Sequence, residues 1–320
     1  MKIKKRIVGV VGVGHVGAHV AFNLGMMGIA DEVRICDVKE QKVISEVQDL
    51  NDAVSYMPNH VIYVASDYAG LKDCDVIVNA SGDISLLTKG NTRDLELANS
   101  VKQVADFVPK IMAGGFQGIF VNITNPCDVI SNLIAETSGL PRQRVVGTGT
   151  LLDSSRLIHS ISAQTGLDAR GFTAFMLGEH GNAQFVAWSC VSFYGKPLAD
   201  FSGDATFRFD KEDLQRRAID GGWVTFRGKQ CTEYGIASAG ATLVRTILHD
   251  EKRIIPVSAP LRGEYGQQDI YCGVPAVIGA DGVERVIEYK LPPEEAAEFA
   301  RCCDTIRANI AKGNEILHKK

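Results

Sequence analysis

The stretch GVVGVGHVGAHVA, Gly9 to Ala21, decides the fold of this chain. It places Gly12, Gly14 and Gly17 directly after an apolar run and at the start of a helical pattern. Glycines at this spacing let the turn close, let the backbone approach a pyrophosphate and let the helix pack closely on the strand. Free N–H groups at the start of the helix would bind the anion. By itself the spacing is equally typical of a tight turn, so its interpretation depends on the sequence around it.

A carboxylate further along the chain supplies that context. The segment VRICDV contains Asp37, 20 residues after Gly17 and at the end of a second apolar run. An acidic side chain at this distance can accept hydrogen bonds from the ribose hydroxyls of adenosine, and it would repel the 2′-phosphate of NADP. Alone, Asp37 would be interpreted as a strand-end cap or a turn residue. Together with the glycine loop it predicts NAD as the cofactor.

The first half of the chain alternates between strand-like and helical patterns. Short runs rich in Val and Ile cover residues 5–11, 33–36, 61–65, 76–79 and 119–123, and the clearest helical pattern covers 95–111. Continuous apolar runs are typical of strands buried on both faces of a parallel sheet. We therefore predict an α/β fold, with a doubly wound, mostly parallel Rossmann sheet over residues 1–147.

Residues 148–320 show a different order of patterns. A helical pattern covers 151–163, a strand-like stretch contains His180, and long helical patterns follow. The segment AVIGADGVERVIEY carries a hairpin signal at ADG, and a final helix is expected after Pro292 and Pro293. These patterns predict a second, α+β domain that binds the substrate and holds the catalytic residues.

Composition argues against several classes of function. The chain has 320 residues, 45% of them hydrophobic and 22% charged, which is enough to bury a sizeable core. A net charge of −4 without a basic face argues against nucleic acid as a partner. The apolar runs fall short of the roughly 20 residues that span a bilayer, and the N-terminal segment does not fit a signal peptide, so we expect no membrane partner and a cytoplasmic location. Eight cysteines without a C-x-x-C pair predict reduced thiols and no metal site.

Two charges stand in an otherwise apolar helical segment of the second domain. Asp153 and Arg156 are three residues apart, which puts them on one face of a helix. An exposed ion pair is the simplest interpretation. Leu151, Leu152 and Leu157 leave little of this segment polar, however, so both charges are expected to be partly buried and to need partners. A histidine that needs a carboxylate, and a substrate carboxylate that needs a guanidinium, would supply them.

His180 stands before an apolar run in the segment LGEHGNAQFVAWS. Taken alone it would be interpreted as a turn or core histidine, with Phe185 to Trp188 as a core strand that anchors its turn. In combination, GTGTLLDSSR, LGEHGNAQFVAWS, ITNPCDVI and GKQCTEYGIA follow one another as in the lactate and malate dehydrogenase family. The chain resembles this family along nearly its whole length, most closely the bacterial L-2-hydroxyisocaproate dehydrogenase branch.

The resemblance implies roles for the charged residues singled out above. His180 would donate a proton to the carbonyl oxygen of a 2-oxo acid while NADH delivers hydride to the carbon. Asp153 would fix the imidazole tautomer and stabilise the imidazolium. Arg156 would pair with the substrate carboxylate through two parallel hydrogen bonds, which a lysine cannot do.

The segment SGDISLLTKGNTRDL resembles the family's mobile loop. Arg93 would polarise the substrate carbonyl once this loop closes, with Gly82 and Gly90 as hinges and Gly82 also as a cofactor contact. Leu87, six residues before Arg93, would face the substrate side chain and disfavour a second carboxylate there.

Two further side chains would complete the substrate pocket. Asn125 of ITNP would hydrogen-bond the reacting oxygen, and Thr232 of QCTEYG would form a wall of the pocket.

These observations predict an NAD-dependent L-2-hydroxy acid dehydrogenase that acts on an apolar 2-oxo acid resembling 2-oxoisocaproate. An L-lactate dehydrogenase acting mainly on pyruvate is the alternative within the family. A non-catalytic NAD-binding sensor would have no need of His180 and Arg156, and both are present. The resemblance also implies a homo-oligomer, either a tetramer or a dimer.

Overall fold

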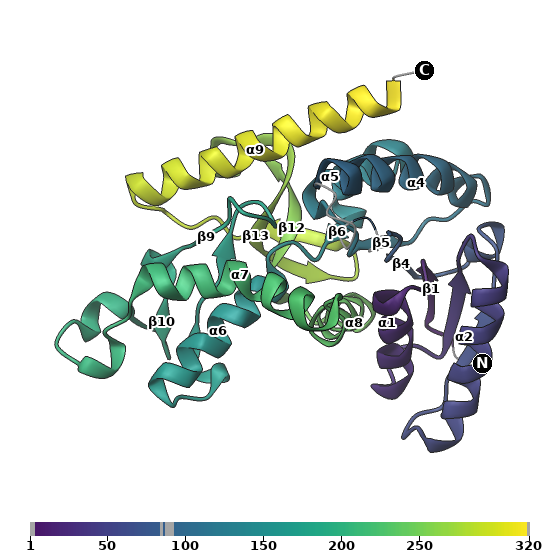
Figure 1. Ribbon diagram of the computed structural model, residues 1–320, viewed down its shortest axis with the longest axis horizontal. Helices are drawn as coiled ribbons and strands as arrows, with labels where there is room; N and C mark the ends of the chain where they lie inside the picture. The colour runs from purple at the N-terminus through teal and green to yellow at the C-terminus, as the bar shows by residue number, and fades with distance from the viewer. Residues whose placement is uncertain (1–3, 84–85, 87–92, 319–320) are drawn as a thin grey trace.

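The computed structural model describes residues 4–83, 86 and 93–318 of the chain. One large sheet runs through this part of the protein, with its strands in the order β14-β13-β12-β6-β5-β4-β1-β2-β3 (Figure 1). Its strands are β1 Ile7–Val11, β2 Glu32–Cys36, β3 Ile62–Ala65, β4 Val76–Asn79, β5 Ile119–Asn122, β6 Val145–Gly147, β12 Arg253–Arg262, β13 Gln268–Gly279 and β14 Gly282–Val286.

The half of the sheet from β3 to β6 is parallel throughout. Its order, 3-2-1-4-5-6, is that of a doubly wound dinucleotide-binding sheet, so the predicted Rossmann fold is confirmed. The glycine loop follows β1, which lies beside both β2 and β4. In such sheets ligands bind at the carboxyl ends of the strands, where the strand order reverses. The fold therefore puts this loop at the expected binding edge.

Both faces of this half-sheet are buried, as the continuous apolar runs predicted. On β4, Val76 and Val78 belong to one core cluster and Ile77 to another, and all three are fully buried. The first cluster includes residues of α1 and α8, and the second includes residues of α4 and α5. These helix pairs lie on opposite sides of the sheet (Figure 1). The larger helices are α1 His15–Met26, α2 Glu40–Ala53, α4 Arg93–Ala113, α5 Cys127–Ser138, α6 Leu151–Thr165, α7 Lys211–Lys229, α8 Tyr234–Leu248 and α9 Pro293–His318.

The second half of the chain extends the same sheet. Strand β12 pairs antiparallel with β6 through Ser258 and Gly147, and β13 and β14 continue outward from it. The predicted hairpin is confirmed, because Gly279 lies opposite Gly282 with the two turn residues between them. The chain passes from β6 at Gly147 into α6 at Leu151. The division into domains 1–147 and 148–320 stays a prediction, since one sheet spans both.

The final helix, α9, runs along the outside of the molecule and contacts α4, α5 and β13 (Figure 1). Within the described residues, no helix has the length and apolar character needed to cross a membrane. In the same part of the chain all eight cysteines are free thiols, and no cluster of three or more His, Cys, Asp or Glu side chains forms a potential metal site.

The segment around His180 is a short hairpin rather than a long strand. Strand β8, Met176–Leu177, pairs antiparallel with β9, Phe185–Val186, and His180 lies in the turn between them. The prediction of a core strand from Phe185 to Trp188 is therefore wrong at its end, because Trp188 begins a 3₁₀ turn and is only partly buried. Gly178 also pairs with Gly273 of β13. The hairpin is thus tied to the main sheet directly before His180.

Candidate active site

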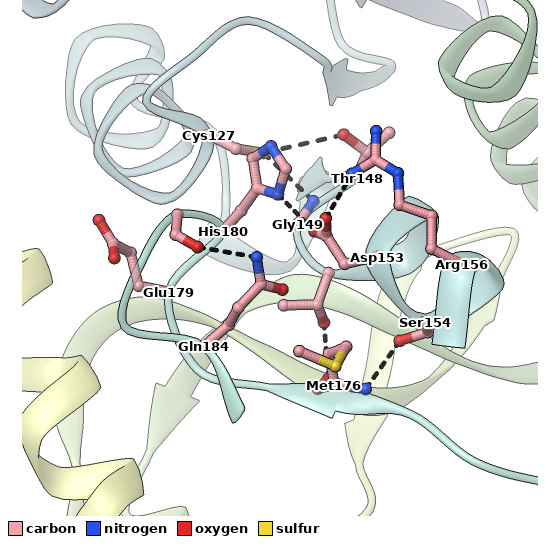
Figure 2. A network of polar contacts seen from close by, with 12 residues as sticks. Cys127, Thr148, Gly149, Asp153, Ser154, Arg156, Met176, Glu179, His180 and Gln184 are labelled. Atoms are coloured by element: carbon pink, nitrogen blue, oxygen red, sulfur yellow. Dashed lines mark hydrogen bonds and ion pairs between the residues drawn. The ribbon is translucent and has the colours of Figure 1, made fainter. Parts of the chain in front are cut away.

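A buried carboxylate joins the two segments that the sequence singled out. Asp153 lies in the first turn of α6 with 1% of its side chain exposed. Its Oδ2 accepts a hydrogen bond from Nδ1 of His180 at 2.6 Å, and its Oδ1 accepts one from Nη1 of Arg156 at 2.7 Å. Figure 2 shows Asp153 between the imidazole and the guanidinium. The ion pair three residues apart therefore exists, but it is buried and shared with the histidine.

The charges of Asp153 and His180 shift each other's pKa values. Burial by itself would raise the pKa of Asp153, but the positive charges and hydrogen bonds of His180 and Arg156 hold it below its usual value. Burial likewise would lower the pKa of His180, but the Asp153 carboxylate outweighs this effect and raises it above the ordinary value of 6.5. The arrangement therefore favours an ionised carboxylate beside an imidazolium. Such an imidazolium can donate a proton at neutral pH.

The side chain of Arg156 runs across two glycines of α7. A Cβ atom on Gly221 would lie 2.8 Å from Cδ of Arg156, and one on Gly222 would lie 3.6 Å from both terminal nitrogens of the guanidinium. Glycine inside a helix costs roughly 1 kcal/mol relative to alanine. In return the two helices approach closely at this point and the arginine passes between them. Only 19% of its side chain is exposed.

A cavity of about 210 Å³ lies beside Asp153, Arg156 and His180. His180, Arg156, Asn125 and Thr232 all line it, so the structure brings these four predicted site residues together. Among the described residues, Oδ1 of Asn125 is buried without a hydrogen-bond partner. A buried acceptor left in this state costs free energy unless a bound molecule donates to it. The cavity therefore holds donors and acceptors suited to a small polar head group.

Part of the cavity wall is apolar. Ile219, Trp223 and Phe226 of α7 line it together with Leu152 and Ile236. Sequence analysis missed this wall because a helix that reads GGWVTFRG has no clear apolar period. The clue that it contains is the pair of glycines beside a tryptophan, which marks close packing rather than chemistry.

The glycine loop has the geometry that a dinucleotide needs. Gly12 has φ of +87°, a left-handed value that favours glycine, and a Cβ on Gly17 would collide with the carbonyl oxygen of Gly12. A Cβ on Gly14, by contrast, would meet nothing within 4 Å. The loop is therefore tight where it folds back and open where a phosphate would approach. These residues fit a bound NAD.

A second cavity, of about 180 Å³, lies beside the glycine loop. Gly14 and Gly82 line it, and it shares Asn125 with the first cavity. Val16, Glu96, Ile123 and Cys231 also line both. The two cavities therefore adjoin, and Gly14 and Gly82 line one while His180 lines the other.

Asp37 follows β2 and lies half-buried beside a separate hollow that Tyr68 also lines. Its carboxylate oxygens accept hydrogen bonds from the backbone N–H groups of Val13 at 2.9 Å and Lys39 at 3.0 Å. The strand-end cap is thus present, and it fixes the glycine loop to the end of β2. A carboxylate has about four acceptor positions, so these bonds leave capacity for ribose hydroxyls.

The loop after β4 is described only in part. Arg93 is the first residue of α4. Leu87 and Gly90 lie outside the described residues. Their expected roles, and that of Arg93, stay predictions.

The structure reveals one further acidic residue that sequence analysis missed. Asp128 lies in the first turn of α5 and is 2% exposed. Its Oδ2 accepts the backbone N–H of His180 at 2.9 Å, and its Oδ1 accepts the hydroxyl of Ser258 at 2.6 Å. Burial raises its pKa to about 6, although both hydrogen bonds act in the other direction. Asp128 therefore holds the His180 turn against α5 and β12.

Comparisons with known proteins agree with this geometry. The family profile described as "lactate/malate dehydrogenase, NAD binding domain" matches residues 6–147, and the one described as "lactate/malate dehydrogenase, alpha/beta C-terminal domain" matches residues 150–317. An L-lactate dehydrogenase of Fusobacterium nucleatum is 38% identical over 314 residues, 97% of this chain and 98% of the relative. L-lactate dehydrogenase 1 of Bifidobacterium longum is 40% identical over 301 residues, 93% and 95% of the two chains.

A solved structure shows the same likeness. The minor L-lactate dehydrogenase from Enterococcus mundtii, in its ligands-bound form, superposes with a TM-score of 0.92 at 32% identity. The superposition covers 96% of this chain and 98% of the other.

Replacing Asp128 by asparagine should change how stability depends on pH. A carboxyl whose pKa is raised on folding stabilises the protein fully below its unfolded pKa, and this contribution is lost as pH rises through the folded value. The wild type should therefore lose up to about 3 kcal/mol relative to Asp128→Asn between pH 4 and pH 7, given the shift from 3.8 to about 6. Denaturant unfolding of both proteins across this range measures the difference.

Asp49→Asn, on the exposed side of α2, is the control for adding any asparagine. The free energy of unfolding of this variant should change with pH in the same way as that of the wild type from pH 4 to pH 7. A constant difference between Asp128→Asn and the wild type over the same range would contradict the buried-carboxyl assignment.

Proposed function

The chain belongs to the lactate/malate dehydrogenase family, and from that premise we propose that it is an L-2-hydroxy acid dehydrogenase acting on an apolar 2-oxo acid of the 2-oxoisocaproate type. Its membership makes it an oxidoreductase, and its cofactor is NAD. The observation that supports the choice of substrate is the apolar wall of Ile219, Trp223 and Phe226 in the cavity that Arg156 and His180 also line.

The proposed reaction uses the two ends of the cavity differently. Arg156, held between Asp153 and the α7 glycines, binds the carboxylate that all 2-oxo acids share. The side chain of the substrate then points toward the apolar wall. Each methylene buried there contributes about 0.8 kcal/mol, so a branched aliphatic chain gains over a methyl group. A second carboxylate at the same place would lose its hydration without finding a partner, which costs several kcal/mol.

Proton transfer is assigned to His180. When bound, NADH supplies the hydride for the carbonyl carbon. His180, charged beside Asp153, donates its Nε2 proton to the carbonyl oxygen, and Asp153 stabilises the imidazolium before this transfer. Asn125 donates an amide hydrogen bond to the same oxygen. In the reverse direction the neutral imidazole takes the proton back.

An L-lactate dehydrogenase that acts mainly on pyruvate is the second candidate. The names of the relatives from Fusobacterium nucleatum and Bifidobacterium longum favour it. The apolar wall of α7 favours the first candidate, since a branched side chain would contact more of this wall than a methyl group. The role of Leu87 in specificity, the homo-oligomeric state and the cytoplasmic location stay proposals.

Substrate ranking is the main test of this proposal. Branched or medium aliphatic 2-oxo acids should match or exceed pyruvate in kcat/KM, and both should lie well above oxaloacetate, with L-configured products. Initial rates of NADH oxidation on a panel of 2-oxo acids measure this order. Phe226→Ala should lower the 2-oxoisocaproate to pyruvate ratio by about fourfold for each methylene left unburied.

Val224→Ala is the matched control, because Val224 lies on α7 but is 62% exposed. It should leave the ratio unchanged. If oxaloacetate ranked first, the assignment of an apolar substrate would be wrong; if pyruvate ranked far above the branched acids, the lactate alternative would hold.

Replacing His180 by asparagine should remove turnover while sparing NADH binding. Loss of a positioned acid lowers kcat by roughly 10²- to 10⁴-fold. In the wild type, kcat/KM for reduction should stay level at low pH and fall as pH rises above the ordinary histidine range, because the pKa of His180 is raised and the acid form is required. His159→Asn, an exposed histidine on α6, is the control and should behave as wild type. Near-normal turnover in His180→Asn would assign the proton to another group.

Cofactor preference tests the assignment of Asp37. NADH should be preferred over NADPH by a few kcal/mol, since the carboxylate bonds the ribose and repels a 2′-phosphate. Asp37→Ser should narrow this preference. The ratio of the two dissociation constants is the appropriate readout, because the loss of the Val13 hydrogen bond affects both cofactors alike. Equal affinities in the wild type would refute the assignment.

A further inference from the structure

One charged cluster beside the glycine loop has no part in the proposed chemistry. His15 is the first residue of α1, directly after Gly14, and it lines the cavity at the glycine loop. Its Nδ1 lies 3.0 Å from Oε1 of Glu233. The other oxygen of Glu233 binds Nζ of Lys229 at 2.6 Å. Three elements, α1, α7 and the start of α8, thus contribute one residue each to this cluster, and His15 is its member that lines the cavity.

Glu233 determines which hydrogen bonds His15 can form with a ligand. The carboxylate has only 10% of its side chain exposed, and its hydrogen bond with Lys229 holds its pKa below the usual value, so it is ionised. An ionised carboxylate accepts the Nδ1–H of His15. In the neutral imidazole the other nitrogen, Nε2, is then an acceptor. Its lone pair would repel an anionic ligand. Only the imidazolium can donate to both sides at once.

We propose that His15 is a ligand of the cofactor diphosphate, that it binds the diphosphate as an imidazolium between this group and Glu233, and that cofactor binding therefore takes up a proton from solvent. The diphosphate belongs at this place because the open side of Gly14 and the free N–H groups of α1 lie next to His15. The first turn of α1 contains no acidic residue that would oppose it.

Several ionisable groups lie near His15 at the edge of the cofactor cavity. Glu233 is ionised and paired with Lys229, and two further acidic residues, Asp83 and Glu96, line the cavity. Burial raises the pKa of Cys231, which lines the cavity as a neutral thiol.

Two ring-bearing neighbours remain. Tyr234 packs against His19 with ring centroids 5.3 Å apart. His19 bonds the carbonyl oxygen of His15 through Nδ1 at 2.7 Å, but it does not line the cavity. It is a second histidine one helical turn away and offers a matched control.

Binding of ADP-ribose, which carries the diphosphate without the nicotinamide, tests the proposal without turnover. Its dissociation constant for the wild type should rise about fivefold to tenfold from pH 6 to pH 9, as expected for one charge-assisted hydrogen bond from a side chain that is 65% exposed before the ligand binds. Titration calorimetry in buffers of different ionisation enthalpy should detect proton uptake at neutral pH. His15→Gln should bind more weakly at pH 6, with a flat pH profile and no proton uptake. Adenosine, which lacks the diphosphate, should bind both proteins with little pH dependence.

Two further variants separate the role of His15 from that of its neighbours. His19→Gln should keep the wild-type profile, and Glu233→Gln should reduce proton uptake because the imidazolium loses its partner. A wild-type profile in His15→Gln would overturn the proposal. So would loss of the pH dependence in His19→Gln, or an equal pH dependence for adenosine and ADP-ribose.

Discussion

The buried charge of Asp153 is the constraint on which the rest of the site depends. An ionised carboxylate removed from water costs several kcal/mol unless cations and hydrogen bonds replace its hydration. Here two cations do so, His180 at 2.6 Å and Arg156 at 2.7 Å. Removing either partner would leave one oxygen of this buried carboxylate without its cation. The elements that hold these partners are therefore fixed relative to α6.

The supports of the two cations lie far apart in the sequence. The turn of His180 is held by the β8–β9 hairpin, by the pairing of Gly178 with Gly273, and by the carboxylate of Asp128. Arg156 is held from the other side by α7, where Gly221 lets the two helices approach. One carboxylate thus aligns the imidazole and the guanidinium in the same cavity, which are the proposed proton donor and the proposed carboxylate-binding group.

The sequence allowed the parallel half-sheet to be predicted because its information is local: continuous apolar runs, a glycine loop and an acid 20 residues later. The pairing of β12 with β6 through Ser258 could not be predicted, because no local pattern encodes which strand extends a sheet. Asp128 was missed for a similar reason. An acid in the first turn of a helix is expected for its favourable interaction with the helix dipole, and its partners Ser258 and His180 lie 130 and 52 residues away. The residues of the site that were predicted, such as Asp153 and Arg156, stood out because charge was unexpected in an apolar helix.

The substrate carboxylate and the substrate side chain are assigned to different helices. The carboxylate of the substrate is assigned to α6, whose Arg156 is aligned by Asp153, while its side chain is assigned to α7, whose Trp223 and Phe226 line the same cavity. These helices pack against each other through the α7 glycines, so the two contacts lie at a fixed separation. Changing Phe226 alters the space for the side chain without touching the ion pair at Asp153. A substitution at Gly221 would instead displace Arg156 and weaken the binding of all 2-oxo acids to a similar extent. The fold therefore lets side-chain preference vary on α7 while the chemistry held by α6 stays the same.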